Sequence, residues 1–180
     1  MSRRFSSEGR RAPAPIDAAK LEALALAYVG RYATTRAKLG QYLDRKLAQR
    51  GWDGEAAADV ASIVDRCARL GYVDDVAFAA ARGASLARRG YGARRVAQAL
   101  RAAGIDADDA APVERAARDD ALRAAIAYAK RRRIGPFSNN SNDDARTRQR
   151  GFAALLRAGH DPEIARHVAY ASEVDILEAE

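Results

Sequence analysis

The stretches LAQRGWD (47–53), LRAAGID (100–106) and LLRAGHD (155–161) all read Leu-x-x-x-Gly-x-Asp, and they decide the fold of this 180-residue chain. In each stretch we interpret the leucine as a last helical contact and the glycine as a left-handed helix end. The aspartate then caps the next helix. A valine follows seven residues after every aspartate, at positions 60, 113 and 168. Three copies of the motif, each with its valine at the same spacing, predict a repeat protein.

The segments between these stretches have helical apolar spacing. Leu39, Leu43 and Leu47 form one stripe. A second stripe contains Val60, Ile63, Val64, Cys67 and Leu70. No run of β-branched residues alternates as a strand would, so we predict an all-α fold. The nine expected helices lie at about 17–32, 35–50, 54–70, 75–89, 92–103, 107–116, 119–133, 143–158 and 162–172.

These helices group into three tandem three-helix repeats. The segment before them, 1–16, holds four arginines and two prolines, and we interpret it as a disordered basic arm. The repeats follow at 17–70, 71–116 and 117–180, and the last includes a short C-terminal tail. The stretch GPFSNNSNDD (135–144) is the clearest internal loop.

Four pairs of neighbouring aspartates fall at predicted helix starts. They are Asp74-Asp75, Asp108-Asp109, Asp119-Asp120 and Asp143-Asp144. Paired carboxylates can serve acid–base chemistry, but at these positions they cap helices and interact with the positive end of the helix dipole. We therefore interpret all four pairs as structural.

Other chemistry-bearing residues are few. His160 and His167 lie seven residues apart, whereas helical zinc ligands lie three or four apart, so we expect a turn residue and a partly buried imidazole. Cys67 is the only cysteine, and its place on an apolar stripe predicts a buried, unreactive thiol. No phosphate-binding or dinucleotide-binding glycine loop is present. We expect no catalytic residue, no metal and no cofactor, and hence no enzyme.

The chain also lacks the sequence features of a membrane or secreted protein. The basic N-terminus has no apolar stretch behind it, unlike a secretory signal. No segment approaches the roughly 20 apolar residues that cross a bilayer. These absences predict a cytoplasmic protein.

Positive charge is the most informative property. Lys and Arg outnumber Asp and Glu by 31 to 24, which gives a formal charge of +7 and attracts nucleic acid, acidic protein surfaces or anionic lipid. Between Val76 and Ile105 there are six arginines and no acid. Arg82 is expected to share the buried stripe of Phe78 and Leu86 and to pair with Asp74 or Asp75. The remaining five predict a polyanion-binding surface: Arg88, Arg89, Arg94, Arg95 and Arg101.

A second basic run covers residues 130–133, and further arginines stand at positions 146, 148, 150 and 157. Cations at a helix C-terminus are favourable in any case, so a structural role and a binding role both remain open for this run. Its candidate binding residues are Lys130, Arg131 and Arg132. Tyr91, between two glycines and near the first arginine group, either stacks on a base or packs between helices.

The stretch GYVDDVAFA (71–79) resembles the Gly-Tyr-aliphatic-Asp-Asp-x-x-Phe-Ala signature of the RecX family, bacterial modulators of the RecA recombinase. RGYG (89–92) and the pattern from Arg95 to Ile105 follow in the family's order. Thr35-Arg36 upstream, and Gly135-Pro136-Phe137 and Arg150-Gly151-Phe152 downstream, extend the resemblance to about residues 20–170. Lys38 and Ala99 stand where the family usually has an acid, so this chain is more basic.

The resemblance implies an elongated, curved arrangement of the three repeats. It also implies a monomer that docks into the groove of a RecA filament on single-stranded DNA and suppresses ATP hydrolysis and strand exchange. Such a protein takes part in DNA repair, homologous recombination and the SOS response. Four signature residues are expected to be structural: Asp74, Asp75, Phe78 and Gly104. The alternative is a helix-turn-helix-like, sequence-specific DNA-binding regulator.

Overall fold

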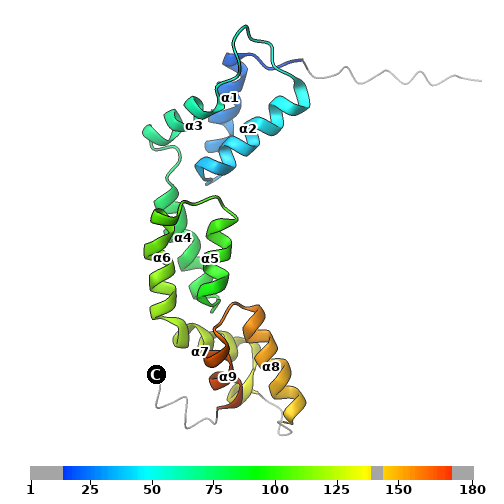
Figure 1. The fold of residues 1–180 in the computed structure, drawn as a ribbon, viewed down its shortest axis with the longest axis vertical. Coiled ribbons are helices and arrows are strands. Elements are labelled where there is room, and N and C mark those ends of the chain that lie inside the picture. The colour runs from blue at the N-terminus through cyan, green and yellow to red at the C-terminus, as the bar shows by residue number, and fades with distance from the viewer. Residues whose placement is uncertain (1–13, 139–143, 172–180) are drawn as a thin grey trace, which may run out of the picture. The chain divides into compact units, whose positions relative to one another are not determined.

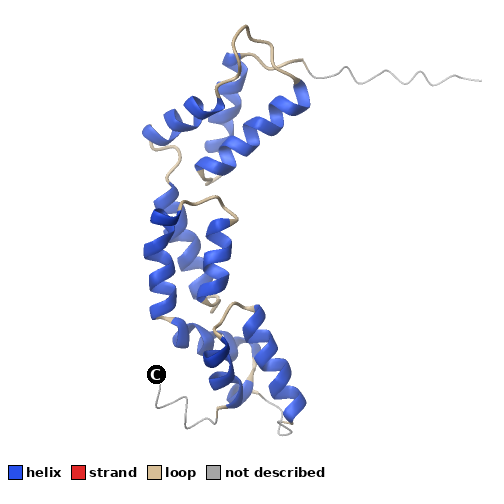
Figure 2. Ribbon diagram, viewed as in Figure 1, coloured by secondary structure: helices blue, strands red, loops and turns tan. Residues whose placement is uncertain are grey.

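The computed structural model describes residues 14–138 and 144–171. All regular secondary structure in these ranges is helical, apart from one isolated backbone bridge, so the predicted all-α class is confirmed (Figure 2). The chain divides into two compact units, Met1–Val73 and Asp74–Glu180, which we call unit 1 and unit 2 and describe separately.

In its described part, unit 1 contains three helices, α1 (Ala18–Val29), α2 (Arg36–Arg50) and α3 (Val60–Arg69) (Figure 1). Their buried apolar side chains form one core. Leu39 and Leu43 are fully buried and Leu47 packs against them, which confirms the first predicted stripe. The second stripe is confirmed at its buried centre, but Leu70 is 61% exposed. Leu70 lies outside the core because α3 ends at Arg69.

The N-terminal arm is shorter than predicted. Residues 1–13 of the expected disordered segment lie outside the described residues, but Ile16 is fully buried in the core of unit 1. Its backbone N–H donates to the Gly51 carbonyl at 3.0 Å, and its carbonyl accepts from the Asp53 N–H at 2.9 Å. Extending the arm to residue 16 is therefore wrong, because an apolar side chain fills the core there and two backbone hydrogen bonds hold it.

Helix α3 begins later than predicted, at Val60 instead of about residue 54. The indole N–H of Trp52 donates to the Ala56 carbonyl at 2.6 Å, within the segment that precedes the helix. Asp59 then caps α3 by accepting from the Ser62 N–H at 2.9 Å. The first repeated aspartate, Asp53, is consequently not the cap that its motif predicts.

In its described part, unit 2 contains six α-helices and a short 3-10 turn, η1 (Gly135–Phe137) (Figure 1). The helices are α4 (Asp75–Arg88), α5 (Ala93–Arg101), α6 (Ala107–Asp119), α7 (Ala121–Arg132), α8 (Ala145–Arg157) and α9 (Pro162–Tyr170). One core cluster joins α4, α5 and α6 around Val96 and Leu100, and a second joins α7, α8 and α9 around Leu155 and Val168.

The predicted helix ends and starts are largely confirmed. The motif glycines have positive φ, with values of 78° at Gly51, 72° at Gly104 and 91° at Gly159. Asp74 accepts from the Ala77 N–H at 2.8 Å at the start of α4, and Asp144 accepts from the Thr147 N–H at 2.7 Å at the start of α8. Asp108 and Asp109 lie in the first turn of α6, as predicted, and Asp143 lies outside the described residues. The prediction that Asp119 lies at a helix start is wrong, because α6 continues to this residue; Asp120 precedes α7 but makes no side-chain cap bond.

The turn between α8 and α9 packs directly against the start of α5. The Gly92 N–H donates to the Ala158 carbonyl at 3.1 Å, and the Arg94 N–H donates to the Gly159 carbonyl at 3.2 Å. A Cβ atom on Gly92 would lie 2.3 Å from the Gly159 oxygen, so only glycine permits this approach. We call this contact the glycine junction.

The two histidines differ from their predicted environments. His160 follows the turn glycine as expected, but its side chain is fully buried, with Nε2 3.0 Å from the Gly90 carbonyl oxygen. The prediction that His167 is partly buried is wrong, because its side chain is exposed. The buried side of α9 carries Ala165, Val168 and Ala169 instead.

Candidate polyanion-binding site

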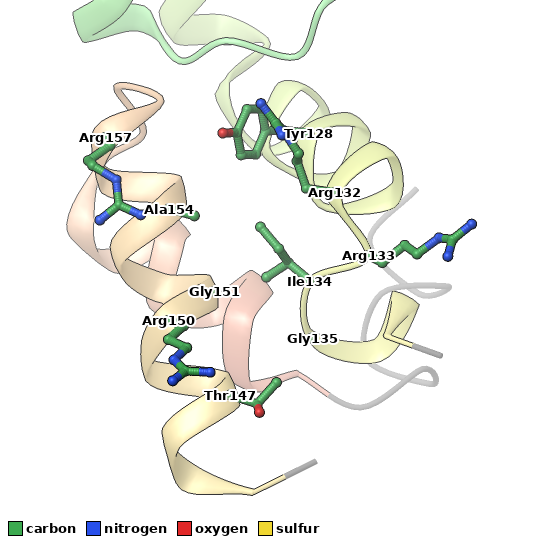
Figure 3. Close-up of a pocket in the computed structure, with 10 residues that line it drawn as sticks. All are labelled: Tyr128, Arg132, Arg133, Ile134, Gly135, Thr147, Arg150, Gly151, Ala154 and Arg157. Atoms are coloured by element: carbon green, nitrogen blue, oxygen red, sulfur yellow. The ribbon is translucent and has the colours of Figure 1, made fainter. Parts of the chain in front are cut away.

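A basic cleft of about 440 Å³ lies between the end of α7 and one face of α8 (Figure 3). We call it the α7–α8 cleft. Among its ten lining residues four are arginines and none is acidic. The arginines are Arg132, Arg133, Arg150 and Arg157.

Helical spacing and one tight contact build this cleft. Arg150, Ala154 and Arg157 lie at i, i+4 and i+7 on α8, so they share a face. The chain leaves α7 through Arg133 in the left-handed conformation, with φ of 55°, and then buries Ile134. A Cβ on Gly151 would lie 2.6 Å from Ile134 Cγ2, so this glycine lets α8 approach the segment that follows α7.

The four cleft arginines are exposed, and none of the ion pairs found within residues 14–138 and 144–171 involves them. Arg132 lies over the Tyr128 ring at 5.8 Å from its centroid. The pKa of Asp144 is lowered mainly by its hydrogen bonds from Thr147 and less by the charge of Arg150. Figure 3 shows Arg150 and Arg157 along α8, opposite Tyr128 and Arg132, while the Arg133 guanidinium points away from α8. Arginine guanidinium groups can each bind a phosphate or carboxylate through two parallel hydrogen bonds.

The five arginines predicted from the acid-free segment are all exposed on α4, on α5 or between them. None of them lines the α7–α8 cleft. Arg89 lies over the Tyr91 ring at 4.9 Å, and Arg95 donates to the Gln98 amide oxygen at 3.0 Å. The glycine junction nevertheless places the first turn of α5, with Arg94, against Gly159, two residues from Arg157. The two basic groups therefore adjoin within unit 2.

Of the second predicted group, only Arg132 lines the cleft. Lys130 lies over the Phe137 ring at 5.5 Å, and Arg131 is exposed on α7. The sequence prediction does not select Arg133, Arg150 or Arg157 as binding residues. The available signal is the i, i+7 spacing of Arg150 and Arg157 with a glycine between them.

The prediction that Arg82 shares a buried stripe is wrong, because its side chain is exposed. The buried side of α4 carries Ala79, Gly83 and Leu86. A Cβ on Gly83 would lie 2.2 Å from Val113 Cγ1, so α6 packs closely on the glycine face and leaves Arg82 outside. The pairing of Arg82 with Asp74 or Asp75 stays a prediction.

The four signature residues lie at the start of a helix, against a core or in a turn. Asp74 caps α4, and Asp75 lies in its first turn. Phe78 packs, partly buried, against the core of α4–α6, and Gly104 has positive φ in the turn between α5 and α6. Tyr91 packs near Tyr128, with ring centroids 6.0 Å apart, which favours its inter-helix role.

Metal-binding and membrane-spanning features are both absent from the described ranges. No cluster of three or more His, Cys, Asp or Glu side chains in residues 14–138 and 144–171 is placed to hold a metal ion. In the same ranges no helix has the length and apolar character required to cross a bilayer. Cys67 is buried as predicted, and burial raises the pKa of its thiol.

Comparisons with known proteins give the family of the chain. Residues 74–112 match the family model described as RecX, second three-helix domain. The chain is 34% identical over 170 residues to Regulatory protein RecX of Myxococcus xanthus (strain DK1622), a match that covers 89% of each chain. It is 32% identical over 162 residues to Regulatory protein RecX of Mycobacterium sp. (strain JLS), covering 87% of this chain and 85% of that protein.

A solved structure supports the fold. The crystal structure of RecX from Lactobacillus salivarius superposes with a TM-score of 0.62 at 18% identity, covering 89% of this chain and 94% of that chain. The identity to the two regulatory proteins extends along most of each sequence, and the chain belongs to the RecX family.

Proposed function

We propose that this protein regulates the RecA recombinase by binding the RecA–single-stranded-DNA filament and suppressing ATP hydrolysis and strand exchange. Membership of the RecX family supports a regulatory role. The observation that carries the binding mode is the α7–α8 cleft, with four arginines and no acid among its lining residues. The protein is proposed to act as a cytoplasmic monomer, without a cofactor, in DNA repair, homologous recombination and the SOS response.

The charge arrangement suits a filament that combines phosphate and protein carboxylates. Guanidinium forks bind both groups through paired, charge-assisted hydrogen bonds. The glycine junction brings the first turn of α5, with Arg94, against the turn that follows α8, which supports a binding surface shared by the two basic groups. A protein that bridges neighbouring parts of the filament in one conformational state stabilises that state. It thereby opposes the conformational changes that accompany ATP hydrolysis.

The direct test is the single-stranded-DNA-dependent ATPase of RecA, measured with and without this protein. We expect slower ATP hydrolysis at stoichiometric or lower amounts of the protein. RecA turnover that is unchanged at saturating protein would overturn the proposal.

Charge reversal then tests the surface. The triple variants R132E/R150E/R157E and R94E/R95E/R101E are each expected to weaken inhibition on the order of tenfold or more, because each loses charged hydrogen-bond donors and adds repulsion. The matched control is R115E/R118E/R123E, which makes the same charge change on exposed positions of α6 and α7. Its two lost surface ion pairs, to Glu114 and Asp120, contribute little to stability. An equal loss in the control would show that net charge, and not this surface, governs inhibition.

The helix-turn-helix-like regulator remains the alternative. It is supported only by short helices joined by glycine turns, and no helix of the described residues stands out as a recognition helix. A screen of duplex sequences separates the two, because a regulator of that class prefers one sequence strongly.

A further inference from the structure

Unit 1 contains a group of tyrosines and basic residues where α1 meets α2, far in sequence from the arginine surface of unit 2. Tyr28 lies at the end of α1, Tyr32 follows that helix, and Tyr42 lies in the middle of α2. The Tyr28 and Tyr42 rings stack, with centroids 4.2 Å apart and planes at 18°. Tyr32 is tilted against Tyr28, with centroids 5.3 Å apart. We call these three residues the tyrosine cluster.

Burial explains only part of this cluster. Tyr28 and Tyr42 pack partly buried against the core of unit 1, and their inner edges contribute to its stability. Tyr32, in contrast, is 50% exposed and does not join that core. A cavity of about 470 Å³ opens over the three rings. An exposed aromatic ring beside an open cavity offers a contact surface that folding does not use.

Cations surround the rings. Arg31 lies over Tyr32 at 5.6 Å from the ring centroid, Arg45 over Tyr42 at 5.7 Å and Lys46 over Tyr42 at 5.5 Å. The cavity is lined by Ala27, Arg31, Arg45 and the three tyrosines, with no acid among them. None of the ion pairs within residues 14–138 and 144–171 involves these three cations.

Helical geometry keeps the carboxylate of Asp44 away from the cluster. Arg45 and Lys46 lie three and four residues after Tyr42, so they project on its side of α2. Asp44 lies two residues after Tyr42, about 200° around the helix, and so projects on the opposite side. The lining of the cavity therefore offers aromatic rings and positive charge but no negative charge.

We propose that the tyrosine cluster is a stacking site for the bases of single-stranded nucleic acid, with Arg31, Arg45 and Lys46 as its phosphate contacts. Aromatic rings in a basic groove are the recurrent means of binding single strands without sequence preference. The cationic groups now over the rings occupy the places where bases would stack, and as long, flexible side chains at the surface they are free to move onto the phosphates. A duplex keeps its bases paired and stacked, so the cluster selects single strands. A cationic ligand is disfavoured by the three positive charges.

This site is independent of the proposed function, because it requires no RecA. The test is therefore binding of a fluorescently labelled oligothymidine to the full chain, followed by fluorescence anisotropy at low salt. Wild-type protein is expected to bind the single strand more tightly than a duplex of equal length. Absence of binding, or a preference for the duplex, would overturn the proposal even if RecA inhibition were intact.

Tyr32 is the residue to change, because its exposure makes loss of folding a small risk. Tyr32→Ala is expected to weaken binding about five- to 150-fold, the range for loss of one stacked base. Tyr32→Phe keeps the ring and is expected to bind within about twofold of wild type, as stacking does not use the hydroxyl group. The matched control is Tyr72→Ala, which removes a tyrosine of unit 1 that is 54% exposed and lies outside the cluster.

Two readouts separate stacking from general charge. Tyr32→Ala should leave the salt dependence of binding unchanged, since it removes no phosphate contact, whereas Arg31→Ala should reduce it. An oligonucleotide that carries 5-iododeoxyuridine should photo-cross-link to the tyrosine cluster, as mapped by mass spectrometry. Equal affinity of Tyr32→Ala and wild type, or cross-links confined to unit 2, would show that the cluster is not the stacking site.

Discussion

The imidazole of His160 is a buried titratable group where the turn after α8 meets α5. It is fully buried, its Nδ1 has no hydrogen-bond partner, and its Nε2 contacts the Gly90 carbonyl oxygen. Burial lowers the pKa of this imidazole below its ordinary value of 6.5, and the Gly90 hydrogen bond opposes this effect only in part. Burial therefore favours the neutral form of the His160 imidazole in the folded protein.

The pH dependence of stability follows from this shift. Because the unfolded chain binds the proton first, the contribution of His160 is complete above pH 6.5 and is lost as the pH falls below that value. The free energy of unfolding should fall by at most about 1.4 kcal/mol per pH unit from this group. Urea titrations between about pH 7.5 and 5.5, either side of the ordinary histidine pKa, measure it. His160→Gln should remove this component and His167→Gln should keep it, and identical slopes for wild type and His160→Gln would contradict the assignment.

Single residues are also where prediction from sequence is least successful. The sequence assigns Arg82 and His167 to buried faces, and both are exposed. The sequence shows the period of an apolar stripe, but which side of a helix faces the core depends on its neighbour. For Arg82 the deciding contact is Gly83 against Val113, between residues 30 positions apart, and no local pattern contains it.

At the scale of helices, capping makes a quantitative prediction. Asp74 accepts a hydrogen bond from the Ala77 N–H, whereas Asp106, which precedes α6, makes no such cap bond. Asp74→Ala should reduce the free energy of unfolding by about 1 kcal/mol, the usual value of an N-cap. Asp106→Ala should have a clearly smaller effect. Denaturant unfolding followed by circular dichroism measures both, and equal losses would show that the Asp74 hydrogen bond is not the source of the stabilisation.

Helix ends could be predicted because glycine and aspartate act locally. Positive φ at Gly104 and Gly159 and the cap at Asp144 follow from these residue types alone. The predicted start of α3 is wrong because the segment before Val60 is not helical, although it is rich in helix-forming alanine. The Trp52 side chain hydrogen-bonds within this segment, and Asp59 caps the helix only after it. The α7–α8 cleft could be predicted only in part, since the approach of Gly151 to Ile134 is a tertiary contact.

At the scale of the whole molecule, the net charge of +7 predicts a strong effect of salt. If about five phosphates are contacted on a single strand, the logarithm of affinity should fall against the logarithm of salt concentration with a slope of roughly −3 to −4. Removing the cleft charges in R132E/R150E/R157E should reduce the steepness by about 2, as each lost contact contributes about 0.7. Anisotropy titrations at several salt concentrations give both slopes. A flat response in wild type would leave protein-only contacts as the binding mode.

The glycine junction has a consequence for the evolution and engineering of this chain. The threefold motif suggests modules that could be exchanged. Its last copy, however, makes contacts beyond its own module, because the turn that ends α8 also packs against the first turn of α5. Deleting the module that carries α8 would leave the backbone N–H groups of Gly92 and Arg94 without their carbonyl acceptors. In a chimaera of two relatives joined between α6 and α7, the start of α5 would come from one parent. The turn after α8, which packs against it, would come from the other. Unit 2 is therefore expected to be inherited and transplanted as one piece.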